Sequence, residues 1–326
     1  MKAVIYTKRG PPAVFQQIEV EMPSPRDDEV LIKVHASSVN SWDWELLRKR
    51  PSMVSLGKRS DTRYKILGAD IAGRVEAVGR DIKRFQPGDE VFGDLCNSGW
   101  GGFAEYVCAL ENALMPKPAG MTFEEAAATP QAGLLALQGL RKKGQIQPGQ
   151  KVLINGAGGG VGTFAVQIAK LFGAEVTGVD STSKLDMVRS IGADQVIDYI
   201  KEDYTKSGQR YDLILDMKGN RSTFDYKRAL HPRGTFVMVG GSWTRLFQLL
   251  LLGPLISMTG SKKMGFLAYK PNKHLDLLVD LIEAGKVVPI IDRRYPLSEV
   301  AEALQYLGEG HVRGKVVVTL EHNNKT

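Results

Sequence analysis

The stretch "KVLINGAGGGVGTFAVQIAKLFGAEVTGVD", residues 151–180, decides the fold. It predicts a strand, a glycine-rich turn, a helix, and a second strand that ends in an acid, Asp180. A strand that turns without side chains into a helix presents free backbone amides and the positive helix end to a pyrophosphate. In the G-x-G-x-x-G register that ends at Gly162, Ala157 replaces the first glycine. Asp180 follows Gly162 by 18 residues, close to the spacing of a dinucleotide-binding βαβ unit.

The end of the second strand, "VTGVDSTSK" (176–184), carries two opposite signals about the nucleotide. Asp180 is placed to accept both adenosine ribose hydroxyls, which favours NAD. Its carboxylate would repel a 2′-phosphate, at about 4 kcal/mol per pair of unit charges ~4 Å apart in an effective dielectric of about 20. Ser181, Thr182 and Lys184 favour NADP instead, because that set can cradle a phosphate. We expect NADH to be preferred, with NADPH as the alternative.

The pattern on either side of this stretch predicts an inserted domain. From about residue 122 onward, strands and helices alternate, which is typical of a parallel sheet with helices on both faces. Thr122 and Glu125 have the spacing of a capping box at the start of this region. The segments before it and after about residue 270 are rich in strands and turns. We therefore predict an α/β fold, with a mostly-β domain from residues 1–122 and 271–326 and a doubly wound nucleotide domain from residues 123–270.

The composition excludes several classes of protein. Two cysteines, Cys96 and Cys108, cannot build a disulfide-rich secreted domain or a four-cysteine zinc site. The N-terminus has no apolar core of a signal peptide, so we expect a cytoplasmic protein. The most apolar run, "LFQLLLLGPLISM" at 246–258, is too short for a bilayer span. We expect a core or interface helix there, with peripheral membrane contact as the alternative.

The net charge of +7 comes from 43 basic and 36 acidic residues. Small basic groups lie at 48–50, 141–143, 261–263 and 292–294. Such a spread is typical of a solvated surface, so we expect no nucleic acid partner, and a polyanion-binding face is the alternative.

Motifs along the whole chain resemble the medium-chain dehydrogenase/reductase superfamily. The nucleotide stretch is accompanied, in the family's order, by "PGDEVFG", "GGFAEYV", "KPAGMTFEEAAATP" and the closing "GKVVV". The resemblance implies a GroES-like catalytic domain with an inserted Rossmann domain, in agreement with the division above. It also implies a homodimer joined through the edge of the Rossmann sheet.

Other residues occupy the positions of the superfamily's zinc ligands. Zinc alcohol dehydrogenases have a cysteine where this chain has Asn40, and a histidine where it has Ala69. Because a zinc site needs three or four such ligands, we predict a zinc-free enzyme. The pattern "SVN-x-x-D", which ends at Asp43, resembles the quinone oxidoreductase branch, as do "VRSIGADQVIDY" and "LAYKPN". That branch implies hydride transfer from NAD(P)H to a quinone or to the β-carbon of an α,β-unsaturated carbonyl.

Such a reaction needs hydrogen-bond donors rather than a metal, because the charge that the substrate accepts delocalises onto its oxygen. Asn40 is the candidate donor, unless it fixes the nicotinamide amide. We expect Asp43 to hold Asn40 or a basic neighbour, and either Trp44 or Trp42 to form an apolar wall of the site. Water is expected to supply the proton at the α-carbon.

The resemblance also assigns residues to the cofactor. Within that set Thr129 lies at a helix start, Tyr199 near the adenosine, and Gly240 and Gly241 at a strand end. The predicted cofactor-binding residues are Thr129, Gly158, Gly159, Gly160, Val161, Asp180, Ser181, Lys184, Tyr199, Gly240, Gly241, Leu267 and Asn272.

Three positions depart from the pattern of the branch. Leu135 stands where the family often has threonine, and Lys218 in "DMKGN" replaces an apolar residue for no reason visible in the sequence. Asp180 stands where the branch usually has a neutral residue and commonly uses NADPH.

Two other functions stay open on the sequence alone. One is a zinc-free NAD(P)-dependent alcohol dehydrogenase that acts on a special alcohol or aldehyde. The other is a nucleotide-binding protein with a structural or RNA-binding role, which the net positive charge permits.

Overall fold

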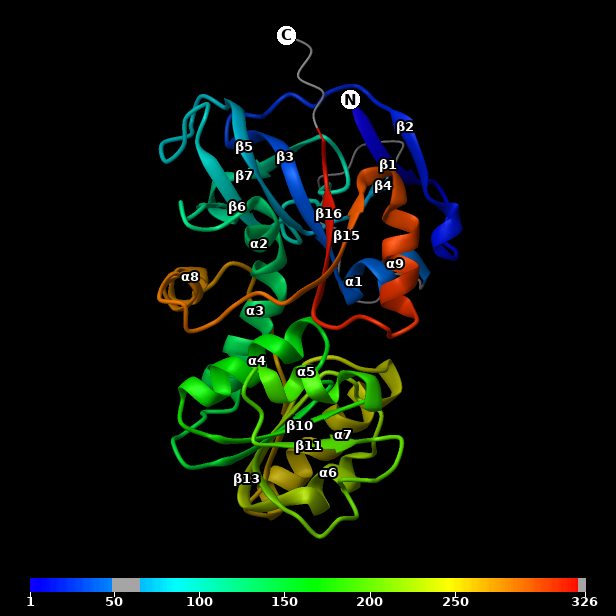
Figure 1. The fold of residues 1–326 in the computed structure, drawn as a ribbon, viewed down its shortest axis with the longest axis vertical. Coiled ribbons are helices and arrows are strands. Elements are labelled where there is room, and N and C mark those ends of the chain that lie inside the picture. Colours follow the sequence, from blue (N-terminus) through cyan, green and yellow to red (C-terminus); the bar gives the residue numbers. More distant parts are fainter. Residues whose placement is uncertain (49–64, 322–326) are drawn as a thin grey trace. The chain divides into compact units, whose positions relative to one another are not determined.

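A computed structural model describes residues 1–48 and 65–321 of the chain (Figure 1). Lys49 and Arg50 of the basic group at 48–50 lie outside these residues. The chain divides into two compact units. The first, called here the β-rich unit, comprises Met1–Leu134, Pro271–Glu283 and Ile291–Thr326, and the second, the nucleotide unit, comprises Leu135–Lys270 and Ala284–Ile290.

The β-rich unit is built on a mixed seven-stranded sheet and a small antiparallel one. In the larger sheet the order is β15-β16-β3-β5-β6-β8, and β7 also pairs with β3. Its strands are β3 (Glu29–Val39), β5 (Asp70–Val78), β6 (Glu90–Asp94), β7 (Tyr106–Leu110), β8 (Met115–Pro116), β15 (Ile291–Pro296) and β16 (Lys315–Thr319). The smaller sheet has the order β2-β1-β4, from β1 (Lys2–Tyr6), β2 (Gln16–Glu19) and β4 (Lys65–Ile66).

The β-rich unit also holds α1 (Ser41–Arg48), α2 (Phe123–Ala128), α8 (Leu275–Glu283), α9 (Val300–Gly308) and the start of α3 (Pro130–Leu137). The predicted capping box is present, since Thr122 Oγ1 accepts from the Glu125 amide (3.1 Å) and Glu125 Oε2 accepts from the Thr122 amide (2.9 Å). Short 3₁₀ turns lie at Pro12–Val14, Glu111–Ala113, Thr182–Lys184 and Leu297–Glu299.

The structure moves the first domain boundary from residue 122 to Leu134. Helix α2 packs against β3, β5 and β16, so it belongs with the β-rich unit. The predicted single helix beyond Thr122 is also divided, into α2, α3 and a π-helical segment at Gln138–Lys143. Pro130 begins α3 directly after Thr129, and proline both lacks an amide donor and restricts the residue before it.

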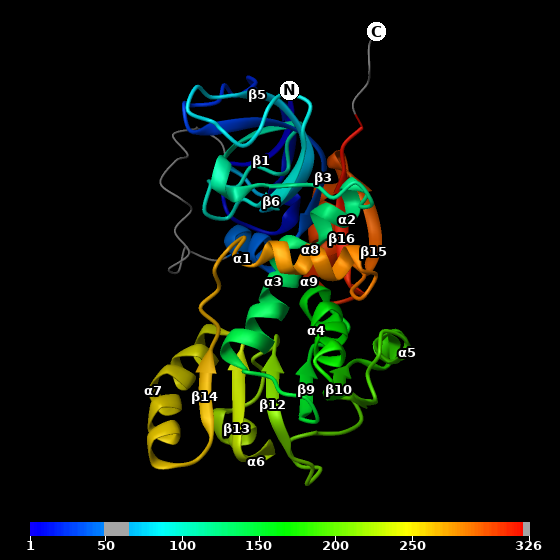
Figure 2. The ribbon, with the colours of Figure 1, turned by 90° about the vertical axis from the view of Figure 1, so that its left-hand side faces the viewer.

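The nucleotide unit contains a six-stranded parallel sheet, and Figure 2 shows its strands pointing in one direction. Its order, β11-β10-β9-β12-β13-β14, is that of a doubly wound dinucleotide-binding fold, which confirms the predicted class. The strands are β9 (Lys151–Asn155), β10 (Glu175–Asp180), β11 (Gln195–Asp198), β12 (Tyr211–Asp216), β13 (Leu230–Met238) and β14 (Lys263–Phe266). Strand β14 was not predicted from the sequence.

Helices α4 (Gly160–Leu171), α5 (Leu185–Ser190), α6 (Thr223–Ala229) and α7 (Trp243–Thr259) belong to the same unit. Helix α7 contains the apolar run predicted as a helix, and its inner side chains Leu249 and Ile256 join the core beside Phe236. Ser257 binds α7 to the sheet, because its hydroxyl accepts from the Met264 amide of β14 at 3.1 Å. Among the described residues, no helix is long and apolar enough to cross a membrane.

Candidate functional site

The ends of three neighbouring strands bring three polar side chains together in the β-rich unit. Val316 of β16 lies opposite Val39 of β3, and Ser38 of β3 lies opposite Asp70 of β5. This register places Lys315, Asn40 and Asp70 next to one another, although they are far apart in sequence. All three are buried, with 3%, 6% and 0% of their surface exposed.

Asn40 is held by an ion on each side of its amide group. Lys315 Nζ donates to Asn40 Oδ1 at 2.5 Å, and Asn40 Nδ2 donates to Asp70 Oδ2 at 2.9 Å. The ammonium and carboxylate therefore fix which way the amide points, since the reverse orientation would set a donor against a donor. The second Asn40 N–H has only a long contact, 3.5 Å, with the Ser38 carbonyl.

Asp70 is the centre of this network. Its Oδ2 also accepts from Ser38 Oγ at 3.1 Å and lies 3.6 Å from Lys315 Nζ, while its Oδ1 accepts from the Gln131 amide at 3.0 Å. Burial raises the pKa of Asp70 to about 6 against the opposing effect of Lys315. Burial also lowers the pKa of Lys315, which Asp70 partly offsets. The Gln131 side-chain Nε2 is buried without a partner among the described residues.

Asp43 holds the backbone at Asn40, the residue that precedes α1. Its Oδ2 accepts from the Asn40 amide at 2.7 Å and its Oδ1 from the Gly68 amide at 2.9 Å. Burial raises the pKa of Asp43 to about 7, although both hydrogen bonds oppose the shift. The side chain is fully buried, so its contribution here is to hold the turn between β3 and α1.

Trp44 does not join the network. Its ring packs where a side chain at Gly308 of α9 would lie, and the Arg48 guanidinium sits 4.5 Å from the ring centroid. Trp44 therefore packs between α1 and α9. Two residues predicted to bind the cofactor, Thr129 and Asn272, make hydrogen bonds within the β-rich unit. The Thr129 hydroxyl donates to the Glu125 carbonyl at 2.7 Å, and Asn272 binds the Asp94 backbone through both ends of its amide.

The donor set around Asp70 does not fit a zinc ion. A cation, the Lys315 ammonium, already occupies the space between the carboxylate and Asn40. Burial and then Asp94 raise the pKa of the nearby Cys96 thiol. No group of three potential metal ligands occurs in the described part of the chain.

In the nucleotide unit, the glycine loop joins β9 to α4 as predicted. Thr163 is the first residue whose amide donates back within the helix, to the Gly159 carbonyl at 2.9 Å. A side chain at Gly162 would collide with the Gly156 carbonyl, whereas a Cβ at Gly159 would meet nothing closer than 3.5 Å. The loop is thus packed on its inner side and open at Gly159, and this shape fits a pyrophosphate above the helix start.

Asp180 lies at the end of β10, but its carboxylate is engaged by the protein. Its Oδ2 accepts from the Gly158 amide (2.8 Å), its Oδ1 from the Ser181 amide (2.8 Å), and Lys184 Nζ lies 3.7 Å from Oδ1. Asp180 and Lys184 are only 3% and 4% exposed. The acid and the base that argue for different nucleotides in the sequence therefore pair with each other.

Lys218, for which the sequence offers no role, lies against the glycine loop. A Cβ at Gly156 would be 3.1 Å from Lys218 Cε, so the lysine stem crosses the first glycine of the turn. Asp216 holds this segment, since its carboxylate accepts from the Lys218 and Gly219 amides at 3.0 and 3.1 Å. The Lys218 side chain is exposed and has no acidic partner among the described residues.

The other predicted cofactor residues of this unit lie at the same, carboxyl edge of the sheet. Tyr199 follows β11 and its amide donates to the Asp180 carbonyl at 3.2 Å. Gly241 has φ +134° and packs on Gly219 beyond β12, a contact that a side chain would prevent. Leu267 follows β14 and donates to the Met238 carbonyl at 2.8 Å.

Comparison with known proteins agrees with this architecture. Family models match an alcohol dehydrogenase GroES-like domain at residues 26–119 and a zinc-binding dehydrogenase domain at residues 191–318. A chloroplastic quinone-oxidoreductase, QR1 of Triphysaria versicolor, is 34% identical over 98% of both chains. The chain belongs to the medium-chain dehydrogenase/reductase superfamily, in its quinone oxidoreductase branch.

Two further members of the superfamily cover most of the chain. The NADPH-dependent alkenal/one oxidoreductase from Arabidopsis thaliana is 32% identical over 98% of this chain and 79% of its own length. The solved structure of the Coxiella burnetii quinone oxidoreductase matches with a TM-score of 0.86 at 30% identity, over 98% of this chain and 99% of that one.

Asp70, Lys315 and Gln131 were not predicted as site residues from the sequence. A signal was present, because an acid and a base each begin an otherwise apolar strand, in "LGADIAG" and "GKVVV". Charged residues at such positions are buried only when they are paired. Which strands pair, and in which register, is what the sequence did not reveal.

Replacing Lys315 with methionine is expected to destabilise the protein in a pH-dependent way. At pH 8 the Asp70 carboxylate would be buried without its cation, at a cost of about 3–5 kcal/mol. The loss shrinks towards pH 5, because Asp70 binds a proton in the folded state well above the unfolded aspartate pKa of about 3.9. Between those two pKa values the folded state holds more protons, so its stability falls as pH rises.

Chemical denaturation at both pH values measures this difference. The exposed Lys83, replaced by methionine, is the matched control and is expected to change stability by less than about 0.5 kcal/mol. An equal loss at pH 5 and pH 8 in Lys315→Met would contradict the assignment of an ionised Asp70 partner.

Proposed function

We propose that this protein is a zinc-independent oxidoreductase that transfers hydride from NAD(P)H to a quinone or to the β-carbon of an α,β-unsaturated carbonyl. The observation that carries the proposal is the buried network around Asn40, which supplies oriented amide donors where zinc enzymes place a metal. The relatives named as quinone and alkenal/one oxidoreductases support the same substrate classes. The glycine loop supports the nicotinamide cofactor.

The bound cofactor supplies the hydride, and the protein's residues act on the substrate oxygen. Asn40 has one N–H that is held only by a long contact, and Gln131 Nε2 has a buried donor without a partner among the described residues. Both residues are held by Asp70, through the Asn40 side chain and the Gln131 backbone. We assign these donors to the oxygen that gains charge, while water delivers the proton to the α-carbon.

The proposal also covers the choice of nucleotide. We retain NADH as the preferred cofactor, because the Lys184 ammonium that would bind a 2′-phosphate is buried and paired with Asp180. Asp180 already accepts hydrogen bonds from two backbone amides, and this weakens the sequence-based expectation that its carboxylate binds the ribose hydroxyls directly. In this proposal the Asp180–Lys184 pair, rather than Asp180 alone, sets the preference for NADH.

We further assign the Lys218 ammonium to the phosphates of the dinucleotide. Its stem lies over Gly156 at the carboxyl edge of the sheet, and no acidic side chain among the described residues neutralises it. A lysine there supplies a mobile point charge to an anion that the loop amides already bind.

We also propose a cytoplasmic location and a homodimer joined at the outer edge of β14. In support of the dimer, β14 ends the described sheet, and Phe266 on it is 41% exposed. Sedimentation equilibrium measures the molecular mass in solution, and a homodimer is expected to show twice the mass of one chain.

The substrate class is tested by following NADH and NADPH oxidation with quinones, enones and simple aldehydes. Enones or quinones are expected to be reduced, and activity confined to aldehydes would refute the proposal. Asn40→Ala and Gln131→Met each remove one donor and are expected to lower kcat for enone reduction by about 10²-fold. Asn112→Ala, an exposed asparagine of the same unit, is the control.

Asp180→Ala is expected to shift the ratio of dissociation constants towards NADPH by at least about tenfold, because it frees the Lys184 ammonium and removes a carboxylate. Fluorescence titration with both reduced nucleotides measures the ratio. The double variant Asp180→Ala/Lys184→Met should lose the gain. A ratio unchanged in Asp180→Ala would show that the pair lies outside reach of the ribose.

Lys218→Gln is expected to weaken NADH and ADP-ribose binding by about tenfold and adenosine binding hardly at all, since only the first two carry a pyrophosphate. The salt dependence of NADH binding should fall as well. The exposed Lys286, replaced by glutamine, controls for general surface charge. Equal effects on adenosine and NADH would assign Lys218 to the fold instead.

A further inference from the structure

The nucleotide unit contains a long segment without acidic residues. Between Asp225 and Asp276, residues 226–275 include eight lysines and arginines and no aspartate or glutamate. The rest of the chain then has 35 basic and 36 acidic residues, so this one segment accounts for the positive charge of the protein.

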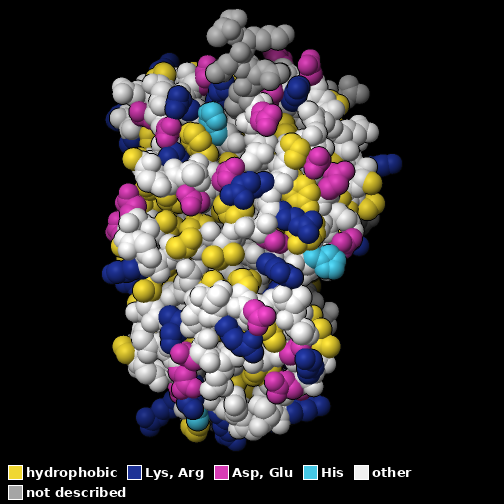
Figure 3. All heavy atoms as spheres, viewed as in Figure 1, with side chains coloured by type: hydrophobic (Ala, Val, Ile, Leu, Met, Phe, Trp, Pro, Cys, Tyr) yellow, Lys and Arg dark blue, Asp and Glu magenta, His cyan; other side chains and the backbone are white. Residues whose placement is uncertain are grey.

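Part of this charge gathers where the parallel strands begin. Lys262 Nζ donates to the Lys227 carbonyl at 2.7 Å, and the Arg233 amide donates to Ser261 Oγ at 3.3 Å. The pKa of Lys262 is lowered by burial and then by the neighbouring Arg210 and Lys227. Figure 3 shows lysine and arginine side chains gathered at the lower end of the nucleotide unit, next to a histidine and apolar atoms.

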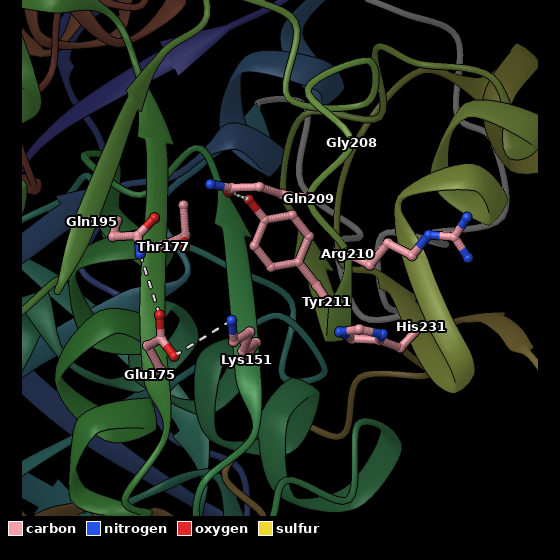
Figure 4. A pocket seen from close by; sticks show the side chains of 9 residues that line it. All are labelled: Lys151, Glu175, Thr177, Gln195, Gly208, Gln209, Arg210, Tyr211 and His231. Carbon is pink, nitrogen blue, oxygen red and sulfur yellow. Dashed lines mark hydrogen bonds and ion pairs between the residues drawn. The ribbon is translucent and has the colours of Figure 1, made fainter.

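A cavity of roughly 250 Å³ opens among these strand ends. Figure 4 shows Arg210 and His231 on one side of it and Lys151 and Glu175 on the other, with Tyr211 between. Lys151 and Glu175 lie 4.0 Å apart and offset each other's charge. Arg210 has no acidic partner among the described residues, so the cavity has a cationic side that suits a phosphate group.

Helix α7, which leads into this region, has an exposed apolar face. On it Phe247, Leu251 and Met258 are 63%, 70% and 82% exposed, while Leu249 and Ile256 on the opposite face are buried. The exposed face is formed by Phe247, Leu250, Leu251, Pro254, Leu255 and Met258, which recur at helical spacing. A continuous apolar face of this kind marks an interaction surface.

We propose that this surface, the outer face of α7 together with the basic residues around Lys262, docks on a bilayer that contains anionic phospholipid. Apolar side chains would enter the boundary between headgroups and acyl chains, and the lysines and arginines would meet lipid phosphates. The inner face of α7 stays in the protein core, so the helix lies along the membrane surface and does not cross it.

Charge favours this occupant over two others. A second copy of the same face would bring the cations around Lys262 against each other, with no acid in residues 226–275 to pair them. RNA would satisfy the cations but gains little from leucine and methionine, because single strands are bound by stacking on aromatic side chains. A phospholipid surface satisfies both the charge and the apolar face.

Co-sedimentation of the full chain with vesicles tests the proposal. Binding is expected to vesicles with about one-third phosphatidylglycerol in phosphatidylcholine, and to weaken with salt, while pure phosphatidylcholine binds far less. Lys227→Gln/Lys262→Gln, which leaves β14 unchanged, should lower the partition coefficient about thirtyfold, and Leu251→Gln/Leu255→Gln at least about tenfold. Retained NADH binding shows that each variant is folded.

Matched controls and opposing outcomes complete the test. Lys201→Gln/Lys286→Gln and Leu171→Gln change exposed residues of the same unit outside this surface and should leave vesicle binding unchanged. Absence of binding to anionic vesicles, or equal binding by the α7 variants, would overturn the proposal. The proposal would also be overturned if Leu251→Gln/Leu255→Gln halved the molecular mass in sedimentation while vesicle binding persisted. Binding of RNA without binding of vesicles would overturn it as well.

Discussion

The β-rich unit depends on one buried ion pair, between the Asp70 carboxylate and the Lys315 ammonium. Each ion alone would be too costly to bury, and the pair is tolerated because Ser38, Asn40 and the Gln131 amide complete its hydrogen bonds. The pair joins the starts of β5 and β16 to the end of β3. It thereby fixes both the register of the central sheet and the direction in which the Asn40 amide points.

In the nucleotide unit, buried carboxylates also hold the backbone in place, through hydrogen bonds to amides of nearby turns. Asp180 holds the glycine loop through the Gly158 amide, and Asp216 holds the neighbouring turn through the amides of Lys218 and Gly219. Two carboxylates, at the ends of the strands on either side of β9, therefore shape the carboxyl edge of the sheet before any ligand arrives. The cationic side chains near them, Lys184 and Lys218, differ in that one is buried and paired and the other is exposed.

Local features could be predicted from the sequence, and features that depend on strand register could not. The Thr122–Glu125 capping box and the loop before α4 each lie within a few residues, and both were predicted. Asp70 and Lys315 meet only through β3, so no local pattern reveals them. Strand β14 was missed because "KKMGF" is short and begins with lysines, and the packing of Trp44 on Gly308 was missed because contact with a distant helix leaves no local sign.

The pairing of Asp180 with Lys184 has a consequence for how nucleotide preference could evolve. Loss of either residue alone leaves an uncompensated charge in a nearly closed environment, so the intermediate is less stable than both endpoints. A lineage that changes its cofactor at this position must replace both residues at nearly the same time or first gain stability elsewhere. The salt bridge thus acts as a barrier between two specificities, and related sequences are expected to keep the pair or to lack both members.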